Sequence, residues 1–521
     1  MNKGLNRTKA ASLNATTMFV TQIVGLVLKF LVQTAFIHEL SQNYLGLNGL
    51  FANVISFLSF ADLGIGTAIT VALYQPIAEN NMPKLRVLID FYRKTYLVII
   101  GVTTVVGVLM SPWIYTFIKN PVFSQTQLAM WFLLYLASTI MTYFSAHKRS
   151  FLISTQEEYL NSLNDFSFKA IQQISQVVVI MVWQSFAGFL VIQLVATLMA
   201  NWQLSRMVQK RYPAIFRREA QKEKYVMDRQ AIRQIKKNVV GAISSKIGTI
   251  VVFGTDNLIL SMFIGLTAVA KYSNYMLVIQ SMNSLFSQVI GSFVSSIGNL
   301  HATATPERQE KVLYRLMYIN AIVNLFVSTG LAFAFSGFIN VWAGKNYLLP
   351  EVVMIVIVLN YSINQARYVV QNFIAGMGLY WSLRWKSLIE AGINLGLSLL
   401  FVSVGQMGVL GVVIGTLGSN ILINVFWEPY IVFHDGLKLP LKRYFCKYFM
   451  YEAFTLIVIV IVGKLGLAAV SAGLPMLILD TMALELTVLL LFGICTSKSD
   501  EFKYVKILIQ KLLVKVKNTI I

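Results

Sequence analysis

Apolar runs of about 20 residues or more, separated by short polar segments, extend along almost the whole chain. Each run is long enough to cross a bilayer as a helix, whereas the strands of a membrane β-barrel would alternate apolar and polar residues. We therefore predict an all-α integral membrane protein with about 14 transmembrane helices. The predicted spans are 13–37, 44–74, 95–118, 126–146, 160–183, 186–206, 238–263, 267–299, 312–337, 349–375, 383–404, 407–433, 446–464 and 474–495.

The most basic segment runs from Arg206 to Lys237 and separates two long apolar halves. It holds eleven Lys and Arg residues against three acidic ones. Because short Lys- and Arg-rich connections stay on the cytoplasmic side, this segment is predicted to be a cytoplasmic linker. An even number of spans then places both termini in the cytoplasm. The start of the chain is polar and basic, so we expect no cleaved signal peptide.

The net charge of +21 follows the same topology. About 35 of the 43 Lys and Arg residues lie in segments assigned to the cytoplasm, which is the positive-inside pattern of membrane proteins. A basic patch that binds nucleic acid would need a soluble domain, and none flanks the linker. We therefore expect no nucleic-acid partner.

An internal repeat relates the two halves. When the chain is shifted by about 223 residues, Pro83 falls on Pro306, and two unusually long spans, 44–74 and 267–299, fall in equivalent places. Six spans per repeat make the copies parallel, which predicts two pseudo-symmetric six-helix lobes around a central cavity. The predicted parts are an N-terminal lobe 1–206, the linker 207–237, a C-terminal lobe 238–434, two additional helices 435–495 and a basic tail 496–521. The tail has the pattern of a helix on the anionic inner leaflet, and a solvated helix would show the same pattern.

Residue chemistry gives little support to an enzyme. The two cysteines, Cys446 and Cys495, lie far apart in the sequence and predict neither a disulfide framework nor a metal site. The predicted outer connections are short and hold few acids, with no arrangement of nucleophile and base. We expect no enzymatic activity, no cofactor and no metal.

Ionisable and amide side chains inside the predicted spans are the candidate functional residues, because a charge there costs at least about 2.5–3.5 kcal/mol. In the first span Gln22, Gly25, Lys29 and Gln33 share one face of the helix. The candidates for the substrate cavity are Lys29, Arg367, Lys246, Lys169, Gln22 and Gln33. The candidates for ion coupling or charge balance are Asp62, Asp165, Asp256 and Glu390.

Some of these residues have a simpler explanation. Asp165 and Lys169 are four residues apart on one helical face and would neutralise each other. Asp62 lies beside two glycines and would bond backbone groups freed by a loosened helix. Lys246 and Glu390 lie within reach of an interface. Tyrosines such as Tyr272, Tyr275, Tyr361 and Tyr368 would stack on sugars or simply pack.

Three stretches of the chain resemble one family. They are YLGLNGLFANVISFLSFADLGIGTAITVALYQPIAEN, FGTDNLILSMFIGLTAVAKYSNY and GMGLYWSLRWKSLIEAGINLGLSLLFVSVGQMGVLGVVIGTLGSNILINVFWEPY. They resemble the bacterial Wzx-type polysaccharide flippases of the multidrug/oligosaccharidyl-lipid/polysaccharide exporter superfamily. The resemblance extends from about Asn14 to the fourteenth span. It is spread over the whole of this region and includes no short diagnostic motif.

The resemblance implies a flippase of the bacterial plasma membrane. Its substrate would be an oligosaccharide repeat unit linked to a polyprenyl diphosphate, moved to the outer leaflet by alternating access during the synthesis of capsule, exopolysaccharide or O-antigen. The two additional helices would bind the lipid tail, as in lipid II flippases. Further implied partners are membrane lipids, a polysaccharide polymerase with its chain-length machinery, and H⁺ or Na⁺ as a coupling ion. A drug/cation antiporter of the same superfamily, a membrane-embedded polymerase and a scaffold are the alternatives.

Overall fold

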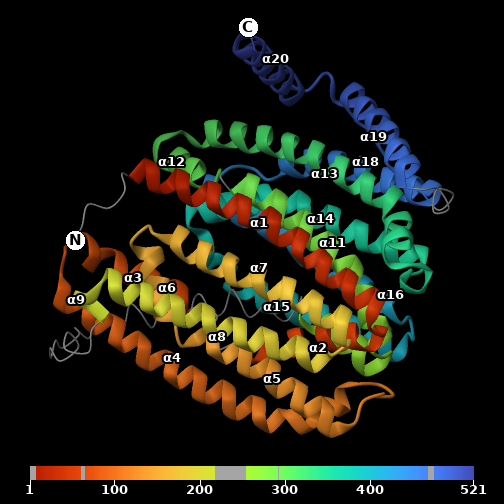
Figure 1. Cartoon of the computed structure of the whole chain (residues 1–521). Helices are drawn as coiled ribbons and strands as arrows, with labels where there is room; N and C mark the ends of the chain where they lie inside the picture. Colours follow the sequence, from red (N-terminus) through yellow and green to blue (C-terminus); the bar gives the residue numbers. More distant parts are fainter. Residues whose placement is uncertain (1–6, 60–64, 217–253, 292, 467–473, 521) are drawn as a thin grey trace. The chain divides into compact units, whose positions relative to one another are not determined.

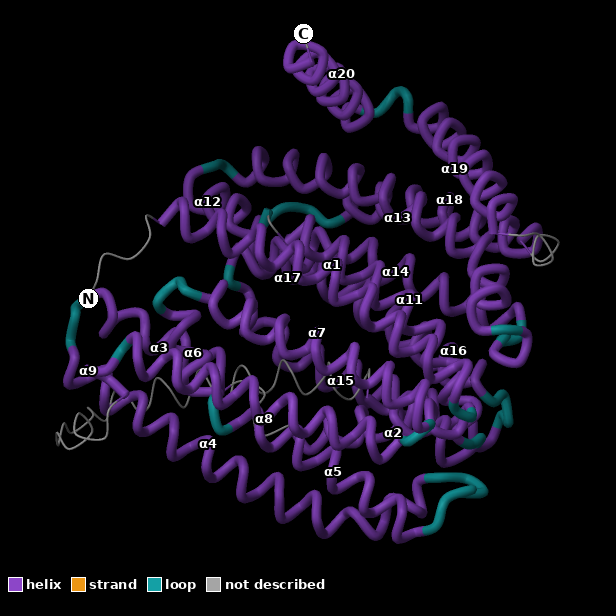
Figure 2. Tube along the Cα trace, viewed as in Figure 1, coloured by secondary structure: helices purple, strands orange, loops and turns teal. Residues whose placement is uncertain are grey.

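The computed structural model describes residues 7–59, 65–216, 254–291, 293–466 and 474–520, and helices are the only regular elements within these ranges (Figure 2). The chain forms two compact units, Met1–Ala270 and Lys271–Ile521, which we call unit 1 and unit 2. The predicted fold class is confirmed.

Unit 1 is a bundle in which α1 packs along α7, α7 along α8, and α8 beside α5 (Figure 1). Its core forms because α4 places apolar and aromatic residues on one face, among them Leu85, Tyr92 and Tyr96. The helices are α1 (Arg7–Glu39), α2 (Gln42–Leu58), α3 (Ile65–Ala78), α4 (Met82–Met110), η2 (Ser111–Phe117), α5 (Gln125–Tyr143), α6 (Ala146–Ser154), α7 (Glu158–Trp183), α8 (Phe186–Arg211) and α9 (Pro213–Phe216).

Unit 2 is organised around α13, which packs against α14, α18 and α19. Aromatic side chains fill its core, where Tyr318 stacks on Phe492 with ring centroids 5.8 Å apart. Its helices are α11 (Leu266–Gly291), which begins in unit 1, α12 (Val294–Thr303), α13 (Pro306–Ala343), η4 (Lys345–Tyr347), α14 (Glu351–Met377), η5 (Leu379–Leu383), α15 (Arg384–Leu399), α16 (Val409–Ser419), α17 (Val425–Ile431), α18 (Lys442–Gly466), α19 (Leu474–Thr496) and α20 (Asp500–Ile520). Three π-helical segments, η6 (Leu400–Val404), η7 (Asn420–Asn424) and η8 (Val432–Leu437), interrupt the helices from α15 to α17.

Ten described helices are long and apolar enough to cross a membrane, and α5 with α6, bent by 41°, would make an eleventh span. These account for all but three of the predicted spans, namely 44–74, 238–263 and 267–299. Most of 238–263 lies outside the described residues. The other two were predicted as continuous helices, but 44–74 contains α2 and α3, and 267–299 contains α11 and the start of α12.

The helices that follow these two predicted spans begin in the same way. Each is a long helix whose first turn holds one of the matched prolines, Pro83 in α4 and Pro306 in α13. Proline suits this position because its ring sets the helical φ and its missing N–H would have no partner there. The internal repeat itself stays a prediction. The predicted lobe boundaries stay a prediction, and the linker is described only as far as Phe216, with α9 at its start.

Gly46 on α2 provides a test of close packing in unit 1. A Cβ atom at this position would overlap the carbonyl group of Leu266, at the first residue of α11. We expect Gly46→Ala to cost about 1–3 kcal/mol, because the backbone of α2 must move away. Thermal melting of purified protein, followed by size-exclusion chromatography, would measure the loss. Gly101→Ala on α4 is the control, since its Cβ would meet nothing within 4 Å. Equal melting temperatures for the two variants would contradict the assignment.

Candidate functional site

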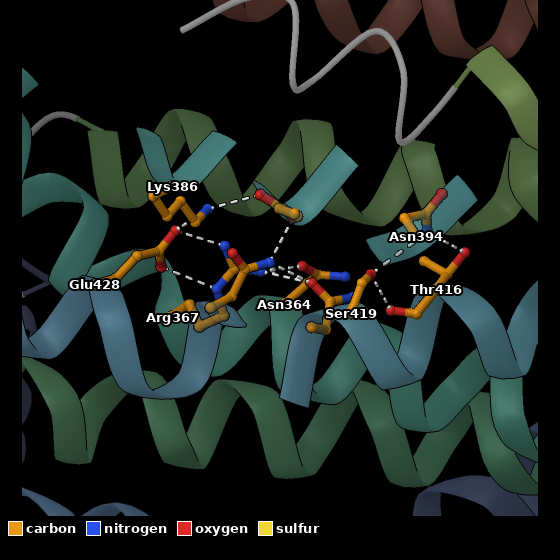
Figure 3. A network of polar contacts seen from close by, with 10 residues as sticks. Asn364, Arg367, Lys386, Asn394, Thr416, Ser419 and Glu428 are labelled. Carbon is orange, nitrogen blue, oxygen red and sulfur yellow. Dashed lines mark hydrogen bonds and ion pairs between the residues drawn. The ribbon is translucent and has the colours of Figure 1, made fainter. Parts of the chain in front are cut away.

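Four charged residues of unit 2 form a compact group, which we call the buried charge cluster (Figure 3). Arg367 on α14 donates from Nε and Nη2 to the two oxygens of Glu428 on α17, at 2.9 and 2.6 Å. Lys386 on α15 lies 2.8 Å from Oε1 of Glu428 and 2.9 Å from Oε2 of Glu390. Arg367, Lys386 and Glu428 are 5, 6 and 3 % exposed. Two positive and two negative charges offset each other. Each ion therefore has a partner of opposite charge, which reduces the cost of burying it in a low-dielectric interior.

Asparagine side chains complete the cluster. Nη1 of Arg367 donates to Oδ1 of Asn364 at 2.7 Å and of Asn420 at 2.9 Å, so every guanidinium nitrogen has a protein partner. Nδ2 of Asn424 donates to Oδ1 of Asn420 at 2.7 Å and to Oε1 of Glu390 at 2.5 Å. Figure 3 shows these polar contacts as one continuous seam between α14, α15 and the helices from α16 to α17.

The local sequence explains why these side chains meet. Lys386, Glu390 and Asn394 are spaced at four residues, and spacings of three or four place side chains on one face of a helix. In the helical segment that faces α15, Asn420 and Asn424 begin and end the π-helical segment η7. A π turn bonds each residue to the fifth along the chain, so it widens the helix and re-aims the residues around it. Glu428 follows one turn later.

A second buried carboxyl group links α18 to the rest of unit 2. Glu452 on α18 is 4 % exposed, and its oxygens accept hydrogen bonds from Nδ2 of Asn324 on α13 at 2.9 Å and from Oγ of Ser362 on α14 at 3.2 Å. Oγ of Ser328 donates to Asn324 at 3.0 Å. Among the described residues no Lys, Arg or His forms an ion pair with Glu452. Three helices are therefore tied together by one carboxyl group.

Unit 1 arranges its membrane charges differently. Lys29 on α1 and Lys169 on α7 are both exposed and near enough for their charges to repel, on helices that pack along each other. Neither ammonium group pairs with an acidic side chain in the part of the chain that the structure describes. We call these two residues the lysine pair. Gln22 and Gln33, on either side of Lys29, are partly exposed, and the space around Gly25 is open.

Asp165 does not neutralise Lys169 in the structure. Its carboxylate bonds the guanidinium of Arg149 on α6, which also donates to Oδ1 of Asn201 at 3.2 Å. The expectation that Asp165 and Lys169 neutralise each other was therefore wrong, because the partner of Asp165 is Arg149. Lys169 keeps its charge available on the surface of unit 1.

Comparison with known proteins identifies the fold. No family model and no curated protein matches this sequence. Among solved structures, the lipid II flippase MurJ in an inward closed conformation matches with a TM-score of 0.68 and 13 % identity, over 93 % of this chain and 99 % of that one. An inward-facing multidrug resistance MATE family transporter matches at 0.63 and 13 % identity, over 79 % of this chain and 95 % of that one. A mutant of the Vibrio cholerae MATE transporter VcmN matches at 0.52 and 14 %, over 83 % and 99 %.

This chain has the fold of the MOP-superfamily transporters. These structural neighbours are named as a transporter and a flippase. The neighbours do not distinguish a Wzx-type flippase from other members.

The remaining candidates are placed as follows. Lys246 and Asp62 lie outside the described residues. Asp256 is 5 % exposed, on the helical residues 254–263. Arg367 and Glu390 belong to the buried charge cluster, so a substrate role for Arg367 would require it to exchange protein bonds for substrate bonds.

Sequence reasoning missed two members of the cluster and Glu452. Lys386 lies at the start of the predicted span 383–404 and was not among the candidates, yet it is buried in a helix long enough to span, Trp381–Val404. The spacing of Lys386 and Glu390 was an available signal for this residue. The regular spacing of Asn420, Asn424 and Glu428, each four residues after the one before, was a signal for Glu428.

The cluster predicts non-additive effects on stability. Glu428→Leu would leave Arg367 buried without a carboxylate, and breaking a buried pair typically costs about 3–5 kcal/mol. The double substitution Arg367→Met/Glu428→Leu removes both ions and leaves Lys386 with Glu390, so we expect it to recover at least about half of the loss. Thermal melting of the purified single and double variants would show this coupling. A double variant whose loss equals the sum of the single losses would contradict it.

Proposed function

We propose that this protein flips polyprenyl-diphosphate-linked oligosaccharide repeat units from the cytoplasmic to the outer leaflet of a bacterial plasma membrane, for cell-surface polysaccharide synthesis. The observation that carries the proposal is the lysine pair. Two neighbouring ammonium groups without a carboxylate suit a ligand with more than one negative charge, and a diphosphate is such a ligand.

The energetics of the lysine pair favour an anionic substrate. Two like charges on adjacent helices repel each other, and taking either out of water without a partner costs free energy. A bound diphosphate would relieve both penalties, so it would stabilise whichever conformation holds the lysines and the diphosphate in a closed site. A ligand shifts a conformational equilibrium only if it binds one conformation more tightly than the other. The lysine pair therefore couples substrate binding to alternating access.

The same charges argue against the drug/cation antiporter. A cationic drug would meet the field of Lys29 and Lys169, while the carboxylates Glu390 and Glu428 already pair with Lys386 and Arg367. The similarity to MurJ adds support, since that protein is named as a flippase of lipid II. The choice of a polysaccharide repeat unit rests on the sequence resemblance.

The other predicted residues take supporting roles in this proposal. Gln22 and Gln33 flank Lys29 and would donate to sugar or phosphate oxygens. Lys246 would add a third cation. Asp62 and Asp256 are the candidates for H⁺ or Na⁺ coupling. Both termini would face the cytoplasm, and the substrate would pass to a polymerase with its chain-length machinery.

Flipping in proteoliposomes would test the lysine pair. Purified protein would be reconstituted with a radiolabelled polyprenyl-diphosphate oligosaccharide, and the fraction of label reached by a membrane-impermeant glycosidase would be followed over time. We expect Lys29→Gln and Lys169→Gln each to slow flipping at least about tenfold, because a hydrogen bond to a charged group contributes about 1.5–3 kcal/mol. Lys29→Arg should keep most of the activity, since it keeps the charge.

Lys464→Gln is the matched control, because it removes one exposed charge from the membrane-length helix Lys442–Leu465 in unit 2. If Lys464→Gln slowed flipping as much as Lys29→Gln does, the effect would be a general one of charge. The lysine pair would then not be a substrate site. If the wild-type protein moved a cationic dye but no diphosphate lipid, the antiporter would replace the flippase.

A further inference from the structure

Unit 1 contains a pocket that the transport proposal does not use. It has a volume of about 350 Å³ and lies where α4, the junction of α5 and α6, the end of α8, and α9 come together. This part of unit 1 is rich in Lys and Arg, so the positive-inside rule places it toward the cytoplasmic leaflet. The lysine pair does not line this pocket.

Basic side chains make up the polar wall of the pocket. Lys148 and His147 on α6 are 7 and 6 % exposed, and Arg93 on α4 stands at the rim with 46 % of its side chain exposed. Among the described residues, Asp90 is an acid whose charge acts on His147. It lies 2.7 Å from Lys94 and 4.0 Å from Arg93, so Lys94 holds most of its charge. The pocket therefore carries a net positive charge.

The buried Lys148 has bonding capacity left over. Its ammonium donates to Oγ of Ser205, and an ammonium has three N–H donors. A ligand oxygen in the pocket would accept from the remaining donors.

The rest of the lining is apolar and aromatic. Leu97 and Phe144, each 47 % exposed, line the pocket together with the buried Phe216. A buried cationic wall next to exposed apolar side chains on membrane-length helices matches a molecule with a phosphate head and a hydrocarbon body. Lys148 and Arg93 can together supply charge-assisted donors to one phosphate group.

We propose that this pocket binds the phosphate group of a phospholipid from the surrounding membrane. The lysine pair is not part of this site, and the inference does not depend on the flippase proposal. Free phosphate shares the head-group chemistry but would leave Leu97 and Phe144 uncovered, so the lipid is the occupant that fits both parts of the pocket.

Calorimetric titration of the purified full-length chain in a neutral detergent would test the site, with dioctanoyl phosphatidic acid as the probe. Arg93→Gln and Lys148→Gln should each weaken binding at least about fivefold, because each removes a charge-assisted contact to phosphate. The glutamine at position 148 retains a donor for Ser205. Lys210→Gln is the matched control, since it removes the same charge from an exposed residue of α8 that neither lines the pocket nor pairs with an acid among the described residues. Its binding constant should change less than about twofold.

Any of three results would overturn the inference. The first is that dioctanoylglycerol, which has no phosphate, binds as tightly as phosphatidic acid. The second is that Lys210→Gln weakens binding as much as Arg93→Gln does, which would mean diffuse attraction to a basic surface. The third is that inorganic phosphate binds as tightly as the lipid, which would assign the pocket to a free anion. Arg93 is half exposed, so Arg93→Gln should fold normally. This variant can therefore decide the test by itself if Lys148→Gln is unstable.

Discussion

The cost of placing charge in an apolar interior governs this structure. An ion without a partner there loses several kcal/mol of solvation, and helices that carry one must either pair it or keep it accessible. The two units adopt different solutions. Unit 2 pairs Arg367 and Lys386 with two carboxylates and closes the group with asparagine side chains. Unit 1 leaves Lys29 and Lys169 exposed on two helices that pack along each other. A closed, neutral group stabilises helix packing, while an open, charged pair offers binding energy to a ligand of opposite sign.

The buried charge cluster also explains the irregular backbone of unit 2. An uninterrupted helix from α16 to α17 would turn the three residues Asn420, Asn424 and Glu428 progressively away from one another, since four residues exceed one α-helical turn. The π-helical segment η7 widens that turn and keeps them aligned with Arg367 and Glu390. The departure from regular geometry is compensated by charge-assisted hydrogen bonds, which are among the stronger ones available to a protein.

Much of the fold was readable from the sequence, because the bilayer imposes a minimum length and an apolar composition on each span. The site was less accessible. Helical spacing shows which residues share a face, as for Gln22, Lys29 and Gln33, but it does not show which helix lies opposite. Glu428 meets an arginine 61 residues earlier, and Asp165 bonds Arg149 instead of its neighbour in sequence. Lys169 could be recognised as a candidate, but its proximity to Lys29 follows only from the packing of α1 along α7.

The carboxyl group of Glu452 makes α18 part of the polar network of unit 2. It accepts from Asn324 on α13 and from Ser362 on α14, which also bond each other. A chain that ended before α18 would keep the bond between Asn324 and Ser362 but would lose both bonds to the carboxyl group. Truncation at this point would therefore leave bonding capacity unfilled inside unit 2 and destabilise the helices that precede the cut.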